Sequence, residues 1–226
     1  MPTSTPLGYD DLPDLLTRLT GDEKHDWSAL STLDVLWVLY DRVLRVDPAH
    51  PNDPERDRFL LSKGHGPAAY YAVLAAKGFV DPDDLDGFGG FDSPLGHHPD
   101  RMLVPGVEIS SGSLGHGLPI AVGMALGLDA QERGGRVVVL VGDAELDEGS
   151  NWEAVQLAGR LGLGRLTTVV VDNRSSTYHW PGGLDARFAA EGWSAERVDG
   201  RDHDALERAL GVTGDRPRLV VAEVER

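Results

Sequence analysis

The chain has 226 residues, a formal net charge of −16 and 26% charged side chains, which suits one α/β domain and disfavours nucleic acid or an anionic membrane as a partner. The sequence contains no cysteine, which excludes disulfides and thiolate metal ligands. Because it also shows neither a signal peptide nor an apolar run of membrane length, we expect a cytoplasmic protein.

The first half of the chain predicts a few helices separated by long polar connections. We interpret residues 1–226 as a single domain with an irregular N-terminal segment. Residues 31–46 place apolar side chains at helical spacing and predict a helix, and residues 67–77 predict another that Gly78 closes. Residues 81–112 predict an extended loop, and loops of that length usually serve a function or are disordered.

The second half alternates between strand and helix patterns after a helix rich in small residues at 114–130, which we expect to be buried. Apolar runs such as VVVLV and TTVVV are typical of strands that are buried on both faces. The alternation predicts an α/β fold: a parallel sheet flanked by helices on both faces. The strands are expected at 136–141, 166–171, 193–198 and 219–224, and the helices at 151–161, 184–191 and 203–210.

Two of these strands end in residues that could bind a metal ion. One run ends at Asp143 and another ends at Asp172 and Asn173, and parallel strands open their carboxyl ends onto one edge. A carboxylate and an amide oxygen suit a hard cation such as Mg²⁺. The alternative is that Asp143 caps the following helix and that Asn173 makes a turn, and spacing alone leaves both interpretations open.

The segment that contains these residues resembles the thiamine diphosphate motif of the transketolase family. That family has a Gly-Asp-Gly opening, a Glu-Gly pair shortly after it and an asparagine downstream. Gly142 and Asp143 stand at the opening, Glu148 begins the Glu-Gly pair, and Asn173 takes the place of the asparagine. Ala144 departs from the pattern, because glycine is usual there.

The resemblance implies the thiamine-diphosphate-binding fold and a set of binding residues. It implies that Asp143, Asn173 and the backbone carbonyl of Ser175 hold Mg²⁺, or Ca²⁺ or Mn²⁺ in its place, on the diphosphate of the cofactor. It also covers the upstream segments around SKGHG, GHHPD and GSLGHG. The cofactor-binding residues that it implies are Ser113, Leu114, Gly115, Gly142, Asp143, Ala144, Glu148 and Asn173.

Four histidines follow from the same resemblance as candidate catalytic residues. His65 would lie near the diphosphate and His98 near the substrate, because imidazole can donate hydrogen bonds and move protons near neutral pH. His116 stands where glutamine is common. His25 falls on the family's N-terminal histidine motif, but the glycines and the proline of that motif are missing here, so a sugar phosphate is not assumed to fit there.

The family's reaction also needs a glutamate against the aminopyrimidine ring of the cofactor, and that residue lies on a following domain. We expect it to come from a separate pyrimidine-binding subunit, in a heterotetramer with two copies of each chain. The predicted function is therefore a two-component transketolase-like transferase that moves a two-carbon ketol unit from a ketose to an aldose.

Three other functions stay open at this point. A related thiamine diphosphate enzyme could act on 2-oxo acids as a decarboxylase or ligase component. A cofactor-free scaffold could stabilise a partner, which Ala144 and the altered region around His25 favour. A flavodoxin-like or nucleotide-binding domain would share the α/β pattern, although the chain has no phosphate loop of the P-loop type.

Overall fold

The architecture is a five-stranded parallel sheet. The computed structural model describes residues 7–19, 30–178 and 180–224. The strand order is β1-β2-β3-β5-β4, and every neighbouring pair is parallel, which confirms the predicted parallel sheet. The strands are β1 (Arg58–Leu61), β2 (Val137–Gly142), β3 (Leu166–Asp172), β4 (Ser194–Asp199) and β5 (Arg218–Glu223).

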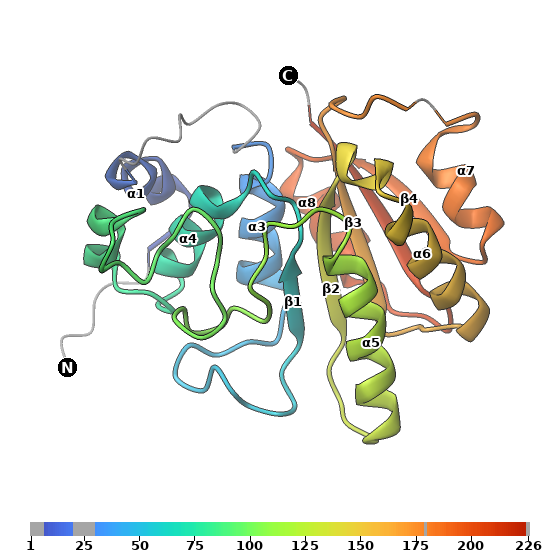
Figure 1. Cartoon of the computed structure of the whole chain (residues 1–226), viewed down its shortest axis with the longest axis horizontal. Helices are drawn as coiled ribbons and strands as arrows, with labels where there is room; N and C mark the ends of the chain where they lie inside the picture. Colours follow the sequence, from blue (N-terminus) through green and yellow to red (C-terminus); the bar gives the residue numbers. More distant parts are fainter. Residues whose placement is uncertain (1–6, 20–29, 179, 225–226) are drawn as a thin grey trace.

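Helices cover both faces of this sheet, as predicted (Figure 1). Each layer buries its own apolar cluster against the strands. On one face lie α1 (Leu12–Arg18), α3 (Leu33–Val38) with its π-helical extension η2 (Leu39–Val43), α4 (Pro67–Ala76) and α8 (His203–Gly211). The other face is covered by α5 (Gly117–Ala130), α6 (Gly149–Leu161) and α7 (Gly183–Ala190).

The two apolar runs form the centre of the sheet because they pack against both helical layers. All six residues of β2 are buried, as are the first six of β3. Val138 belongs to the cluster on one face and Val139 to the cluster on the other, which is the alternation that a strand imposes on its side chains. None of the helices among the described residues is long and apolar enough to cross a membrane.

Several sequence predictions need correction. Strand β1 was not predicted, although it pairs with β2 over Arg58–Leu61. The helix expected over 31–46 is shorter than predicted and consists of α3 and η2. The loop expected over 81–112 contains a 3-10 helix, η3 (Pro82–Gly87). The helix α5 is not fully buried, because Ile120 and Leu126 on it are exposed. Two further 3-10 helices are η1 (Tyr9–Asp11) and η4 (Ala144–Asp147).

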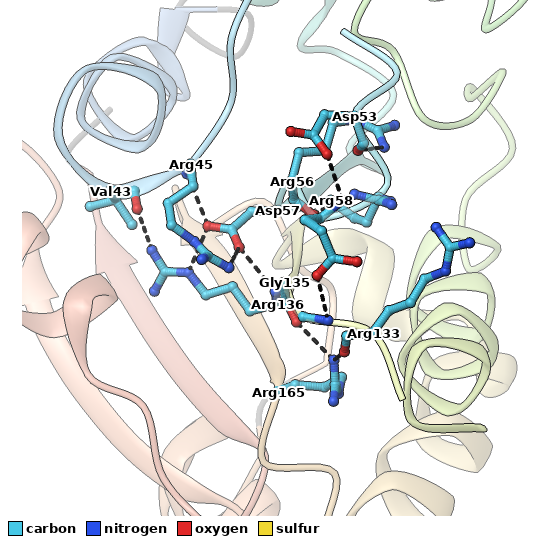
Figure 2. A network of polar contacts seen from close by, with 12 residues as sticks. Val43, Arg45, Asp53, Arg56, Asp57, Arg58, Arg133, Gly135, Arg136 and Arg165 are labelled. Carbon is cyan, nitrogen blue, oxygen red and sulfur yellow. Dashed lines mark hydrogen bonds and ion pairs between the residues drawn. The ribbon is translucent and has the colours of Figure 1, made fainter. Parts of the chain in front are cut away.

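The amino ends of the strands are joined by an arginine-rich network around Asp57 (Figure 2). The carboxylate of Asp57 is 1% exposed and accepts hydrogen bonds from the backbone N–H groups of Arg45, at 2.9 Å, and Arg136, at 3.0 Å. The Arg136 guanidinium also donates to the backbone oxygens of Val43 and Leu210. This network connects β1 and β2 to the helices η2 and α8. It lies at the amino ends of the strands, at the end of the sheet opposite to their carboxyl ends.

Candidate cofactor-binding site

Asp143 and Asn173 lie at the same edge of the sheet, at the carboxyl ends of adjacent strands. Asp143 directly follows β2, and Asn173 directly follows β3. Gly142 pairs with Val171 in the register of the two strands, and the backbone N–H of Asp143 donates to the carbonyl of Val171 at 3.2 Å. The structure therefore brings the two residues to neighbouring positions, as the parallel arrangement requires.

The Asp143 carboxylate holds the loop that follows β3. Its Oδ2 accepts from the backbone N–H groups of Ser175, at 2.6 Å, and Ser176, at 2.9 Å, while Oδ1 accepts from the hydroxyl of Ser175 at 2.6 Å. Asp143 makes no side-chain cap to η4, the helix that it precedes. The alternative in which Asp143 only caps a helix is therefore not what the structure shows.

Asn173 contributes a buried amide oxygen without a partner. The residue is 7% exposed, and its Oδ1 has no hydrogen-bond partner within the described part of the chain. An unsatisfied buried polar atom costs about 1–3 kcal/mol, so it calls for a bound water, ion or ligand. The next residue, Arg174, has a φ of 57°, a conformation in which non-glycine backbone is strained. The strain falls between Asn173 and Ser175.

A second aspartate supports the same loop from the end of η4. The Asp147 carboxylate accepts from the hydroxyl of Ser176 at 2.8 Å, and from the hydroxyl and backbone N–H of Thr177 at 2.9 and 3.2 Å. Asp143 directly precedes η4 and Asp147 is its last residue, and together they hold residues 175–177. The sequence pattern assigned no role to Asp147.

These residues fit a hard divalent cation. Such ions take carboxylate, amide and carbonyl oxygens, and Mg²⁺ fills its remaining positions with water and phosphate oxygens. Asn173 offers a free oxygen, and a carboxylate has about four lone-pair sites, so the three bonds to Asp143 leave room for a metal. Within the described ranges, no group of three or more His, Cys, Asp or Glu side chains could hold a metal ion, so a cation here would depend on this mixed set of oxygens.

The surroundings are acidic, which bears on how an anionic cofactor could bind. Asp143, Glu145, Asp147 and Glu148 follow one another within a single short segment. A diphosphate would be repelled by these carboxylates unless a divalent cation lay between them. The helix α6 begins at Gly149, directly after this segment, and a helix N-terminus favours anions through its free N–H groups.

Glu145 is the main residue of this region that the sequence pattern did not reveal. It is 1% exposed, and its carboxylate accepts hydrogen bonds from Ser62, Gly115 and Gly142. Burial raises the pKa of the Glu145 carboxyl, while these hydrogen bonds oppose the rise. No periodicity marks a single glutamate inside a motif, so only the fold reveals that it is buried.

The loop with the implied cofactor residues Ser113, Leu114 and Gly115 lies against the loop that contains His65. A Cβ atom on Gly64 would lie 3.5 Å from the Leu114 side chain, and a Cβ on Gly115 would lie 2.8 Å from the Cβ of Glu148. Ser113 and Leu114 are exposed, whereas Gly115 is buried. The structure thus gathers these three residues, Glu148 and the loop of His65 at one end of β2.

The remaining candidates are the four histidines, of which the structure describes three. The ring of His98 packs against Gly112, where a Cβ would lie 2.7 Å from the His98 Cγ. His116 is exposed at the N-cap of α5, and His65 is exposed in the turn before α4. His25 lies outside the described residues.

Ala144 creates no backbone strain. It opens η4 and does not have a positive φ, so the departure from glycine at this position is compatible with the local conformation.

Comparison with known proteins identifies the family. Residues 20–223 match the family model described as transketolase, thiamine diphosphate binding domain. The transketolase of Leishmania mexicana superposes with a TM-score of 0.79 at 26% identity, over 97% of this chain and 37% of that one. The chain therefore spans a little over a third of the length of that solved enzyme.

Two relatives match over most of their length. A protein of Rhodococcoides fascians named ferredoxin fas2 is 56% identical over 98% of this chain and 74% of its own length. One subunit of the apulose-4-phosphate transketolase of Actinobacillus succinogenes is 38% identical over 89% of this chain and 76% of its own. The first name does not transfer, because ferredoxin clusters are held by cysteine thiolates and this chain has no cysteine.

Proposed function

Since this chain belongs to the transketolase family, as a thiamine diphosphate binding domain, we propose that it is the cofactor-binding subunit of a two-component transketolase. The observation that carries this proposal is the unpartnered, buried Oδ1 of Asn173 at the same sheet edge as Asp143. This atom costs stability unless a bound group satisfies it, which favours a cofactor-binding subunit over a cofactor-free scaffold.

We assign the metal ligands to Asp143, Asn173 and the carbonyl of Ser175, with Mg²⁺ as the ion, or Ca²⁺ or Mn²⁺ in its place. Asp143 and Asp147 keep the loop 175–177 beside the ion. Gly142, Ala144, Glu148 and the exposed residues Ser113 and Leu114 contact the cofactor, together with Gly115. When bound, thiamine diphosphate would supply a nucleophilic carbon, and its thiazolium ring would accept the electron pair of a breaking carbon–carbon bond.

The histidines of the chain handle hydrogen bonds and protons around that group. His65 donates to the diphosphate from the loop before α4. His98 and His116 act on substrate hydroxyl and carbonyl oxygens, for which imidazole suits both donation and proton transfer near neutral pH. His25, from the segment before α3, completes the proposed catalytic set.

The second component is a pyrimidine-binding subunit that supplies the glutamate for activating the cofactor. The Actinobacillus relative is itself named as one subunit of its enzyme, which supports a partner for this chain as well. The helices α5 and α6 pack on each other and expose Ile120, Leu157 and Leu161, and covering these apolar side chains with a partner would be favourable. We propose that this side meets the partner in a heterotetramer, with Glu148 and Glu153 near the interface.

The proposed reaction moves a two-carbon ketol unit from a ketose to an aldose. The experiment mixes the chain with the candidate partner, Mg²⁺ and thiamine diphosphate, and follows ketose and aldose products. We expect activity from the mixture, none from either protein alone, and none after chelation of the metal. Turnover by this chain alone would contradict the two-component assignment. Pyruvate as donor separates a 2-oxo acid decarboxylase or ligase from a transketolase.

A further inference from the structure

The buried carboxylate of Glu145 joins three segments that meet below the proposed cofactor site. Its Oε1 accepts from the backbone N–H of Gly115 at 2.9 Å and from the hydroxyl of Ser62. Its Oε2 faces the backbone N–H of Gly142 at 3.4 Å. One side chain therefore connects the turn after β1, the glycine loop before α5 and the end of β2.

Ser62 extends this connection into the first turn of α5. Its hydroxyl donates to Glu145 and accepts from the backbone N–H of Gly117 at 3.0 Å. The first N–H groups of a helix have no partner within the helix, so Ser62 satisfies one that Gly117 would otherwise leave free. Glu145 therefore holds the N–H group of Gly115 directly and the N–H group of Gly117 through Ser62.

The approach of these segments is too close for side chains at the two glycines. A Cβ on Gly117 would lie 2.3 Å from the Cβ and Oγ of Ser62. Gly115 has a φ of 80°, and a Cβ there would lie 2.6 Å from the hydroxyl of Ser150, which itself donates to the Gly115 carbonyl at 2.7 Å. Glycine at position 117 lets the loop approach Ser62, and glycine at position 115 lets it approach Glu148 and Ser150.

We propose that Glu145 is a positioning residue, whose carboxylate sets the conformation of residues 113–115 for the cofactor. This inference rests on the proposed function, because it concerns the same site. Gly115 is held inward by Glu145 on its N–H and by Ser150 on its carbonyl, which leaves Ser113 and Leu114 exposed at the edge of the sheet. Glu145 touches neither substrate nor cofactor, and acts through the loop.

The first test measures the loop without any cofactor. Hydrogen exchange is followed for the amides of residues 112–117 in the wild-type chain and in Glu145→Gln, Glu145→Ala and Ser62→Ala. Loss of a hydrogen bond to a charged group speeds opening by about tenfold or more. We expect that acceleration for Glu145→Ala, a smaller one for Glu145→Gln, which keeps one carbonyl oxygen and the side-chain volume, and a measurable one for Ser62→Ala.

The matched control is Glu191→Gln, at the C-terminal end of α7 and outside this network. It should leave exchange in residues 112–117 unchanged. If Glu145→Ala does not fold, the Glu145→Gln and Ser62→Ala variants carry the test. Unchanged exchange in both of these variants would overturn the inference, whatever the protein binds.

The second test measures thiamine diphosphate binding, with Mg²⁺ and the partner subunit present, by calorimetry and by turnover. We expect Glu145→Gln to raise the Kd and the apparent KM for the cofactor by about threefold to tenfold, with kcat at saturating cofactor close to wild type. Faster loop exchange with an unchanged Kd would overturn the positioning role. If the wild-type complex binds no cofactor, the proposed function fails, and loop exchange alone then decides whether Glu145 orders residues 113–115.

Discussion

The carboxylate of Asp143 and the backbone N–H of Ser175 are joined by a hydrogen bond of 2.6 Å that crosses from the end of β2 to the loop after β3. This contact couples the positions of two proposed metal ligands, Asp143 after β2 and Ser175 after β3. Any change at Asp143 must therefore alter both the charge offered to a cation and the position of Ser175.

Replacing Asp143 with asparagine separates these two effects. The amide oxygen can still accept from Ser175 or Ser176, so the fold should persist, but a neutral amide is a weaker ligand for Mg²⁺ than a carboxylate. We expect metal-dependent cofactor binding to weaken by about tenfold or more in a calorimetric titration. Asp143→Ala should abolish it, and should also lower the free energy of unfolding by about 1–3 kcal/mol because two backbone N–H groups lose their acceptor. Wild-type cofactor affinity in either variant would show that Asp143 is not a ligand.

Asp147→Ala should weaken the metal site without removing a ligand. The bonds from Ser176 and Thr177 to the Asp147 carboxylate are partly exposed, and competition from water keeps the contribution of each at about 0.5–1.5 kcal/mol. We expect a loss of metal affinity of about tenfold or less, together with faster hydrogen exchange over residues 175–177. The exposed Asp84 in η3 provides the matched control, Asp84→Ala, which should change neither quantity.

Gly115 and Gly123 offer opposite responses to the same substitution. Gly115→Ala must place a Cβ at positive φ and within 2.6 Å of the Ser150 hydroxyl, so we expect a loss of about 1–3 kcal/mol in a urea titration. Gly123 is exposed within α5, and a Cβ added there would meet no atom within 4 Å among the described residues. Gly123→Ala should stabilise the chain by about 0.5–1 kcal/mol through helix propensity, and equal effects at both sites would refute this account.

Acid should destabilise the chain through Asp57. Burial raises the pKa of its carboxyl, but the N–H groups of Arg45 and Arg136 and the charge of Arg136 outweigh burial and hold the pKa below its ordinary value. The resulting stability is present above the pKa of an unfolded aspartate, about 3.9, and is lost as pH falls through the lower folded value. Urea titrations at descending pH should show a smaller loss of stability for Asp57→Asn than for wild type.

The central strands could be predicted from the sequence because their apolar runs are long and unmistakable. Residues 137–142 and 166–171 are buried against two helical layers, and such strands need β-branched side chains on both faces. Strand β1 was missed because it has four residues and no alternating pattern. Its identity as a strand comes from pairing with β2, which is a tertiary contact.

The site, like the sheet, could be predicted from the sequence only in part. Asp143 and Asn173 could be placed at one edge because parallel strands dictate it, and the family resemblance supplied their expected roles. Glu145 could not be found in this way, because its partners Ser62 and Gly115 are far from it in sequence. The exposure of Ile120 and Leu126 was also missed, since an all-apolar helix does not reveal which of its sides the rest of the chain covers.

The order of the strands has a consequence for how the chain is made. Strand β5 lies between β3 and β4, so β4 emerges from the ribosome before the only strand with which it pairs in the sheet that the structure describes. Until residues 218–223 are synthesised, β3 and β4 each present an open edge, and unpaired edges invite association with other chains. The sheet can therefore close only after β5 has emerged, and nascent chains that stall before β5 are expected to need chaperones.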